Sequence, residues 1–455
     1  MIELKRRLEA AGLTEDAIAA AFGSVASVEA ADVHLRRLES DGSRASLIRL
    51  FVLGEVVSAD SLPVAADELE AAGLVEREGD VVRTSFRLTP HEGLLLAHDG
   101  EERVREADYV TGVNNATRTL STLTIREPVA RALDLGTGCG VQALLAARHA
   151  EATVATDVNG RALDYARLNA GLNGLEVDLR HGSWFEPVAG ESFDLILSNP
   201  PFVISPDSSY VFRDSSLPGD AVSRDVVRGA AGHLRAGGHA TILCNWICRS
   251  RDETWQPLEE WVDGTGCDAL LLAHEPVEPF TYAARWNEPL RGDRKAYAAA
   301  VERWLDYYER ERIAAIGIGA VVLRRREGEN WRRGFDLPRP STGRAGAHLL
   351  RLFAAGDAPL DDDDLLGGRF RLVEGHRLDQ SLRYAGDEYE LGSVRMSLDD
   401  GVGLVADVDA AALPVLFALE PARALGEAIA AAKVDRAETI PTVRRLYELG
   451  FLDRA

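Results

Sequence analysis

The sequence ends one apolar run in an unusual corner, FDLILSNPPFVIS, which spans residues 193–205. Pro200 and Pro201 have no N–H to donate, so a paired strand cannot continue past Asn199. The carboxamide oxygen of Asn199 and the backbone carbonyl of Pro200 can instead accept both hydrogens of one NH2 group. The ring of Phe202 offers a flat apolar face to a planar group. This four-residue corner is therefore predicted to hold a planar amide or amino nitrogen for reaction.

Strand-like and helical segments alternate around this corner and must position it. Near-continuous apolar strands that alternate with helices predict an α/β domain with a parallel sheet buried on both faces. In such a sheet the carboxyl ends of the strands meet at one edge, where ligands bind. The last two strands flank an insert at about 276–312 and are predicted to form an antiparallel hairpin; whether the insert, with Arg285 and Trp286, is a substrate lid is left open. The segments that read as strands are 131–136, 153–158, 175–184, 193–201, 239–246, 268–275 and 316–325.

A glycine-rich loop, LDLGTGCGVQAL, follows the first of these strands. Gly136, Gly138 and Gly140 let the backbone turn tightly before the next helix and approach a ligand closely. Asp134 lies at the end of the strand, and Thr137 lies between the first two glycines. The spacing is GxGxG rather than the GxGxxG of dinucleotide-binding folds. A tight turn without a ligand is the alternative interpretation.

The second strand ends in Asp157 and Val158. A carboxylate at this tip can accept hydrogen bonds from both hydroxyls of a ribose. The alternative for Asp157 is a helix N-cap, because a helical segment follows directly. After the third strand, RHGSWFEP brings Ser183 and Trp184 to the same edge of the sheet. Asp157 therefore predicts a ribose-binding position at the tip of the second strand.

The combination of Asp134, the GxGxG loop, Asp157 and the Asn-Pro-Pro-Phe corner resembles the class I S-adenosylmethionine-dependent methyltransferases of the NPP(Y/F) group. Within that group, residues 129–250 look like the HemK-type glutamine methyltransferases, which share the methyltransferase small domain. The resemblance implies a seven-stranded Rossmann-like sheet, S-adenosyl-L-methionine as cofactor, and N-methyl transfer with Asn199, Pro200, Pro201 and Phe202 as the catalytic corner. The cofactor-binding residues that it implies are Asp134, Gly136, Thr137, Gly138, Gly140, Asp157, Val158, Ser183, Trp184 and Asn199.

Two segments near these motifs carry further information from the resemblance. Ser183 stands where many relatives have an Asp that accepts from the adenine amino group, and Trp184 is expected to cover the ring. The segment 109–123, just before the first strand, closes over the donor in relatives. Thr111, Asn114 and Thr117 in that segment are therefore candidates to line the pocket, with an N-cap and linker as the alternative.

The acceptor is less sharply predicted than the reaction. Phe202 replaces the usual Tyr of the glutamine enzymes and favours the enzymes that act on RNA guanine. The following loop, residues 203–220, lacks the His of that RNA group and resembles the HemK-like loop. We favour a protein glutamine, for instance in a translation factor, over adenine N6 or guanine N2 of RNA or DNA. A natural-product substrate and a binding module without turnover remain as alternatives.

The length of the chain predicts several domains. Residues 1–90 read as helices, including one at 28–40, followed by a short hairpin at 74–88; this is the outline of a helical or winged-helix-like domain, which binds nucleic acid or protein. A linker at 91–128, the methyltransferase domain at 129–333 and a small α+β domain at 334–455 complete the prediction.

Composition restricts the partners. The formal net charge of −22 argues against a broad nonspecific nucleic-acid surface. The densest basic segments, 323–327 and 331–334, are interpreted as a solvated strand end and a turn. No apolar run approaches the roughly 20 residues that span a bilayer, and the first residues lack a secretory core, so we expect a cytoplasmic protein without a membrane partner.

Metal chemistry is not expected. The four cysteines give no disulfide framework, and the spacing of Cys244 and Cys248 is not that of a zinc knuckle. The acidic run at 360–368 lacks the ligand spacing of a calcium loop and is interpreted as a solvated loop. No metal site is therefore predicted.

Overall fold

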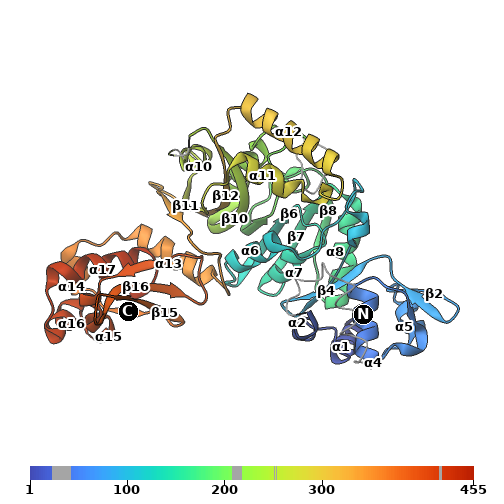
Figure 1. Cartoon of the computed structure of the whole chain (residues 1–455), viewed down its shortest axis with the longest axis horizontal. Coiled ribbons are helices and arrows are strands. Elements are labelled where there is room, and N and C mark those ends of the chain that lie inside the picture. Colours follow the sequence, from blue (N-terminus) through green and yellow to red (C-terminus); the bar gives the residue numbers. More distant parts are fainter. Residues whose placement is uncertain (23–41, 208–217, 251, 253, 420–422, 455) are drawn as a thin grey trace. The chain divides into compact units, whose positions relative to one another are not determined.

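The computed structural model divides into two compact units, each described here by itself (Figure 1). The first unit comprises residues 1–118 and 127–235, and the second comprises residues 119–126 and 236–455. The predicted helix at 28–40 lies outside the described residues. The structure describes residues 1–22, 42–207, 218–250, 252, 254–419 and 423–454.

The first unit begins with helices and a small antiparallel sheet in the order β1-β3-β2. The predicted hairpin is confirmed: β2 pairs with β3 around Gly79, whose φ of 62° suits a tight turn. Buried leucines and Phe51 from these elements join one hydrophobic core with Leu96 and Leu144 further along the chain. The elements are α1 (Ile2–Ala10), α2 (Glu15–Phe22), α4 (Gly42–Leu47), the π-helical turn Ile48–Val52, β1 (Val57–Ser58), α5 (Ala66–Ala71), β2 (Glu76–Glu78) and β3 (Val81–Arg83).

A second hairpin, β4 (Arg87–His91) and β5 (Leu94–His98), follows directly and forms a two-stranded antiparallel sheet of its own. Helix α6 (Asn115–Leu123) then leads to the central sheet. The predicted linker at 91–128 thus contains regular structure, because the apolar run LLLA pairs with β4 and is buried.

The predicted α/β fold with a large, mostly parallel central sheet is confirmed. In the first unit β6 runs parallel to β7 and β9, and β7 runs parallel to β8. Leu135 is in register with Thr156 and Ser198, and Asp157 with His181, so the carboxyl ends of these strands align. The elements are β6 (Val129–Leu135), α7 (Val141–Ala146), β7 (Ala150–Asp157), α8 (Gly160–Asn173), β8 (Asp178–His181), β9 (Phe193–Ser198) and α9 (Ala221–His233).

The remaining strands of the sheet are antiparallel or lie at its edge. Strand β12 runs antiparallel to both β10 and β11, which agrees with the predicted hairpin. The insert between β11 and β12 forms two helices that bury Tyr282, Trp304 and Tyr308. The sheet order is β13-β11-β12-β10-β9-β6-β7-β8. The elements are β10 (Leu234–Cys248), α10 (Gln256–Val262), β11 (Cys267–Ala273), α11 (Pro279–Trp286), α12 (Arg294–Arg310), β12 (Ala315–Arg325) and β13 (Arg332–Asp336).

The eighth strand, β13, is one more than the seven predicted. The interpretation of the second basic segment as a turn is wrong, because this segment opens β13, which pairs in parallel with β11. The pairing supplies partners for the backbone, and Phe335 is buried. Arg332 and Arg333 can occupy positions in this strand because β13 lies at the edge of the sheet.

The C-terminal part of the second unit mixes helices with short strands, as predicted. Strands β15, β16 and β17 form an antiparallel sheet, and β14 pairs with β18. The acidic run at 360–368 is not a loop: it forms α14, where the Asp361 carboxylate accepts from the Asp364 N–H at 2.8 Å as an N-cap. The elements are α13 (Gly346–Asp357), α14 (Asp362–Gly367), β14 (Phe370–Leu372), β15 (His376–Tyr384), β16 (Tyr389–Leu398), β17 (Ala406–Val408), α15 (Leu413–Phe417), α16 (Leu425–Ala432), α17 (Arg436–Glu448) and β18 (Leu452–Arg454).

An ion cluster around the buried carboxylate of Asp268 joins this part to the strands of the same unit. Arg324 donates to Asp268 at 2.6 Å and to Asp357 of α13 at 2.8 Å. Burial alone raises the pKa of the Asp268 carboxyl, but hydrogen bonds from Arg326 and Arg324 outweigh it and lower the pKa overall. The basic segment 323–327 is thus largely occupied by internal ion pairs.

Candidate active site

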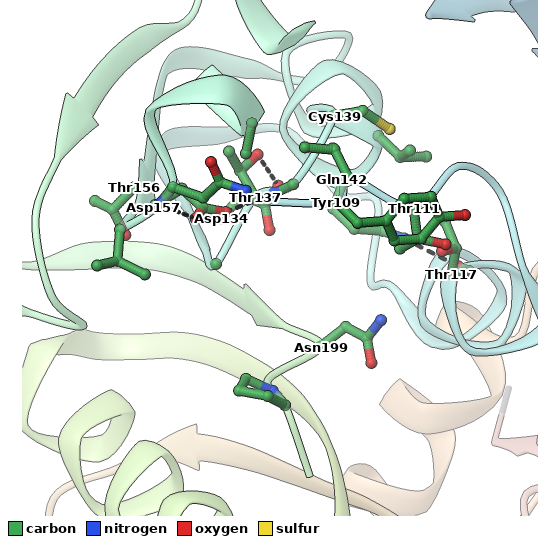
Figure 2. Close-up of a pocket in the computed structure, with 18 of the residues that line it drawn as sticks. Tyr109, Thr111, Thr117, Asp134, Thr137, Cys139, Gln142, Thr156, Asp157 and Asn199 are labelled. Atoms are coloured by element: carbon green, nitrogen blue, oxygen red, sulfur yellow. Dashed lines mark hydrogen bonds between the residues drawn. The ribbon is translucent and has the colours of Figure 1, made fainter. Parts of the chain in front are cut away.

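A cavity of about 500 Å³ lies at the carboxyl ends of β6, β7 and β8, within the first unit. Figure 2 shows Asp134 and Asp157 together on one side and Tyr109, Thr111 and Thr117 on the other. Most of the site residues predicted from the sequence meet here. Those that line the cavity are Asp134, Gly136, Thr137, Gly138, Asp157, Val158, Ser183, Trp184, Asn199 and Pro201.

The glycine-rich loop forms the floor of the cavity. Gly136 and Gly138 have φ values of 73° and 54°, which side chains rarely adopt, and a Cβ at either would meet no protein atom within 4 Å. The backbone therefore faces open space that a ligand can occupy. Gly140 does not line the cavity; it precedes α7 with φ 92°, and a Cβ there would lie 3.1 Å from the Cβ of Ala166. The absence of a side chain at Gly140 therefore allows the loop to pack closely on α8.

Asp134 is a buried carboxylate at the end of β6, 2% exposed. Its Oδ2 atom accepts from the Thr137 hydroxyl at 2.6 Å and from the Ala143 N–H at 2.9 Å. Burial raises the pKa of this carboxyl to about 6, although both hydrogen bonds oppose the rise. Asp134 therefore fixes the loop and places a titratable charge beside the cavity.

Asp157 lies at the tip of β7 and binds the backbone on both sides. Its Oδ2 atom accepts from the Gly138 N–H and its Oδ1 atom from the Asn159 N–H, each at 2.8 Å. The alternative role as an N-cap belongs to Asn159, whose side chain accepts from the Arg161 N–H at the start of α8. Each carboxylate oxygen keeps a lone pair that can accept from a ligand hydroxyl.

The corner after β9 presents one unsatisfied acceptor. The Ser198 hydroxyl donates to the Leu135 carbonyl at 2.9 Å and fixes the strand end. The next residue, Asn199, projects toward the cavity (Figure 2), and its Oδ1 atom is buried with no hydrogen-bond partner among the described residues. A buried carboxamide oxygen without a donor costs free energy, so it marks a place where a ligand donor fits. Pro200 and Phe202 do not line the cavity.

Backbone strain accompanies the segment after β8. Trp184 has a φ of 48°, in the left-handed region that non-glycine residues seldom occupy. The Gly182 N–H donates to the Asp157 carbonyl at 3.1 Å and holds this segment against the tip of β7. Strain of this kind concentrates at ligand sites. Ser183 and Trp184 line the cavity, and their contacts with a base stay a prediction.

The segment before β6 closes another side of the cavity. Thr111 and Thr117 line it, together with Tyr109, whereas Asn114 does not. The Asn114 carboxamide accepts from the Thr117 N–H at 2.9 Å, which is the N-cap alternative.

Sequence reasoning missed Tyr109, Cys139 and Gln142. Gln142 was identifiable as the one polar residue in the apolar run VQALLA; it is buried and donates to the Thr117 carbonyl at 2.9 Å.

Comparison with known protein families identifies which family the cavity region resembles. Residues 110–260, which contain every cavity residue except Tyr109, match the family described as the Methyltransferase small domain. Residues 10–85 match a domain of unknown function, DUF7059. The predicted family resemblance is therefore confirmed for the central third of the chain.

Curated relatives of the methyltransferase domain act on different macromolecules. It is 40% identical over 129 residues to a release factor glutamine methyltransferase of Xylella fastidiosa, covering 26% of this chain and 47% of the relative. It is 38% identical over 153 residues to a ribosomal protein uL3 glutamine methyltransferase of Bradyrhizobium diazoefficiens, covering 30% and 47%. It is 34% identical over 128 residues to the ribosomal RNA small subunit methyltransferase C of Escherichia coli, covering 28% and 34%. The chain thus spans less than half the length of these relatives.

The cavity of the methyltransferase domain fits S-adenosylmethionine. Its only charged lining residues, within the described part of the chain, are the carboxylates Asp134 and Asp157. Carboxylates suit a ligand that carries a sulfonium and an ammonium, and Asp157 is free to accept from ribose hydroxyls. Among the described residues, no group of His, Cys, Asp and Glu is arranged to hold a metal ion, and the four cysteines are free thiols. In the same residues, no helix has the length and apolar character that crossing a membrane needs.

The raised pKa of Asp134 predicts a pH dependence of donor binding. Because the carboxyl protonates near pH 6, lowering the pH from 8 to 5 removes a negative charge that attracts a cationic ligand. We expect the affinity for S-adenosylhomocysteine, whose ammonium is retained, to fall by several-fold to about tenfold across this range. Calorimetric titration at several pH values measures it. An affinity that is flat from pH 8 to 5 would contradict a charge–charge role for Asp134.

Proposed function

We propose that the chain is an S-adenosylmethionine-dependent N-methyltransferase that modifies a planar NH2 group of a macromolecule, specifically the side-chain amide of a glutamine in a protein. The observation that carries this proposal is the buried, unpartnered Oδ1 atom of Asn199 at the cavity wall. An acceptor held in place without a donor is what an incoming NH2 group needs. The family match of residues 110–260 supports the reaction type.

The chain contributes positioning rather than a nucleophile. S-adenosylmethionine, when bound, supplies an electrophilic methyl group on a sulfonium. The Asn199 carboxamide oxygen accepts one N–H group of the substrate, which turns the nitrogen lone pair away from it and toward that methyl. The Pro200 carbonyl, which the sequence predicts as the second acceptor, belongs to a residue that does not line the cavity. Correct placement of two reactants removes most of the entropic barrier. With the donor bound, transfer to the substrate nitrogen would release a neutral thioether, and the extra proton on the nitrogen would pass to water afterwards, so this chain would need to supply no general base.

Internal pairing of the arginines favours a protein acceptor over a nucleic acid. In the basic segments of the second unit, Arg324 and Arg326 bind Asp268, and Arg333 donates to the Glu448 carbonyl. Cations engaged in this way are poor phosphate ligands, because they would first have to leave their partners. The two relatives named for glutamine modification support the same acceptor.

The N-terminal region is compatible with protein recognition. Helix α5 followed by the β2–β3 hairpin supports the winged-helix interpretation, which we retain as part of the proposal. The cations of this hairpin are paired, Arg77 with Asp67 and Arg83 with Glu76. The wing therefore offers no free basic surface among the described residues for a nucleic-acid backbone. A translation factor or ribosomal protein in the cytoplasm is the partner class that we propose.

A base amino group is the second candidate. Phe202 in place of Tyr and the likeness to a ribosomal RNA methyltransferase favour it. The same Asn199 geometry would accept the exocyclic NH2 of guanine or adenine, since an aryl amine and an amide present similar planar groups. The two candidates differ in the molecule that carries the methyl group.

Transfer of a radiolabelled methyl group from S-adenosylmethionine into cell extract tests the proposed function. The extract is split after reaction and digested with protease or with nuclease. We expect the label to become acid-soluble after protease and to resist nuclease. Label released by nuclease would show that the acceptor is a base amino group and would contradict the glutamine assignment. Absence of any label, together with no donor binding in calorimetry, would contradict the methyltransferase proposal.

A further inference from the structure

The outer edge of β5 is paired with asparagine side chains instead of a strand. In the β4–β5 hairpin, alternate residues of β5 direct their backbone groups away from β4. The Leu95 N–H donates to the Asn173 carboxamide at 2.9 Å, and the Asn173 amide donates back to the Leu95 carbonyl at 2.8 Å. Asn169, one turn earlier on α8, pairs with Ala97 in the same two-way manner at 2.6 and 3.0 Å. Two carboxamides thus replace a third strand and bind the hairpin to α8.

Asn169 also reaches the glycine-rich loop. Its amide donates to the Cys139 carbonyl at 2.8 Å, and Asn169 itself is fully buried. Cys139 lines the cavity between Gly138 and Gly140. The single side chain of Asn169 therefore spans from β5 to the floor of the donor cavity. Asn173 makes the equivalent contact with β5 without any recorded contact to the loop.

The end of the same hairpin holds a second wall of the cavity. Asp99, 1% exposed, follows β5 and accepts from the Val110 N–H at 2.9 Å, while the Asp99 N–H donates to the Val110 carbonyl at 3.1 Å. Arg161 and Tyr165 of α8 donate to the same carboxylate at 2.5 and 2.8 Å. Val110 lines the cavity. Asp99 therefore ties the segment before β6 to the hairpin and to α8.

A close backbone approach reinforces this wall. A Cβ at Gly112 would lie 2.5 Å from the ring of His98, so only glycine fits against this side chain. The His98 ring is fixed by hydrogen bonds to the Thr89 hydroxyl and the Asp99 carbonyl, both at 2.8 Å. Gly112 also lines the cavity.

We propose that the β4–β5 hairpin is a positioning element of the donor cavity, acting through Asn169 on the glycine-rich loop and through Asp99 on the segment 109–112. The hairpin lies outside both matched families, which end at residue 85 and begin at residue 110. The proposal rests on the proposed function only in naming the donor as the ligand. It makes residues 87–99 part of the binding machinery rather than a connection between two domains.

The matched pair Asn169→Asp and Asn173→Asp tests the proposal in the full chain. Each change removes amide donors to the hairpin, but only Asn169→Asp removes the donor to Cys139. In the ligand-free protein we expect faster hydrogen exchange of the amides of residues 136–142 in Asn169→Asp than in Asn173→Asp, compared at equal loss of thermal stability. The dissociation constant for S-adenosylhomocysteine should rise about tenfold in Asn169→Asp, as for loss of one buried hydrogen bond, and about twofold or less in Asn173→Asp.

Equal effects of the two variants on loop exchange would overturn the proposal, because Asn169 would then act only through stability. If the wild-type chain binds no S-adenosylhomocysteine, the proposed function fails, while the exchange comparison still decides the positioning role. Asp99→Asn provides a separate test that does not depend on the folding of Asn169→Asp. We expect it to accelerate exchange at residues 109–112 and weaken binding several-fold, whereas the charge-matched Asp108→Asn, at a half-exposed side chain, should change neither; equal behaviour of these two would also overturn the proposal.

Discussion

Asn199→Ala is expected to abolish methyl transfer while leaving donor binding nearly unchanged. The substitution removes the buried acceptor that holds the substrate NH2 group, but none of the hydrogen bonds that fix the glycine-rich loop or Asp157. Losing the orientation of one reactant costs at least about a hundredfold in rate. The measurements are kcat for methyl transfer and the calorimetric dissociation constant for S-adenosylhomocysteine.

Asn199→Asp is the matched control for this prediction. It keeps an acceptor oxygen at the same place, replaces the amide donor by a second oxygen and adds a negative charge, and because the acceptor remains we expect it to retain more transfer than Asn199→Ala. If Asn199→Ala lost methyl transfer and donor affinity to the same extent, the proposal that Asn199 holds the acceptor would be wrong. Equal activity of the two variants would show that the carboxamide oxygen is not the group that matters.

Asp157→Ala is expected to do the opposite and weaken donor affinity first. Its carboxylate organises Gly138 and Asn159 and, in the proposed complex, accepts from the ribose hydroxyls. Loss of these charge-assisted hydrogen bonds costs ~2 kcal/mol, or about 30-fold in affinity. Transfer should recover in large part at saturating donor, so the Michaelis constant for the donor rises more than kcat falls.

Asp164→Ala controls for the change in net charge. Asp164 lies on α8, the helix that follows β7; its side chain is 78% exposed and pairs only with Arg167 in the contacts recorded for it. It should leave donor binding unchanged. If Asp157→Ala lowers kcat at saturating donor and leaves the dissociation constant as in the wild type, the assignment of Asp157 to the donor is wrong.

The central sheet and most of the cavity were predictable because they depend on local patterns. Apolar strands alternating with helices fix a parallel sheet, and a parallel sheet brings its carboxyl ends together. Asp134 and Asp157 lie at the carboxyl ends of such strands and Asn199 directly follows one, so their meeting at one cavity follows from the topology. The glycine positions were readable for the same reason, since their conformations serve a turn within a few residues.

Other parts depend on contacts between distant residues and carry no local signal. Asn169 pairs with Ala97 and Cys139, which lie 72 and 30 positions away, and within its own helix it reads as an ordinary polar residue. Strand β13 was missed because its two arginines break the apolar pattern of a strand. The segment is a strand because it pairs with β11, which is distant in sequence. Gln142 lay within a motif already recognised, yet its partner Thr117 belongs to another element.

The most direct test of the central claim is the chemical nature of the methylated product. Protein labelled by the purified chain with radioactive S-adenosylmethionine is hydrolysed completely in strong acid, and volatile bases are collected. A methylated glutamine amide breaks down to glutamate and methylamine, so the account predicts that the label distils as methylamine in the wild type and is absent with Asn199→Ala. Label that stays on a non-volatile amino acid, or that enters RNA instead of protein, would contradict methylation of a glutamine amide.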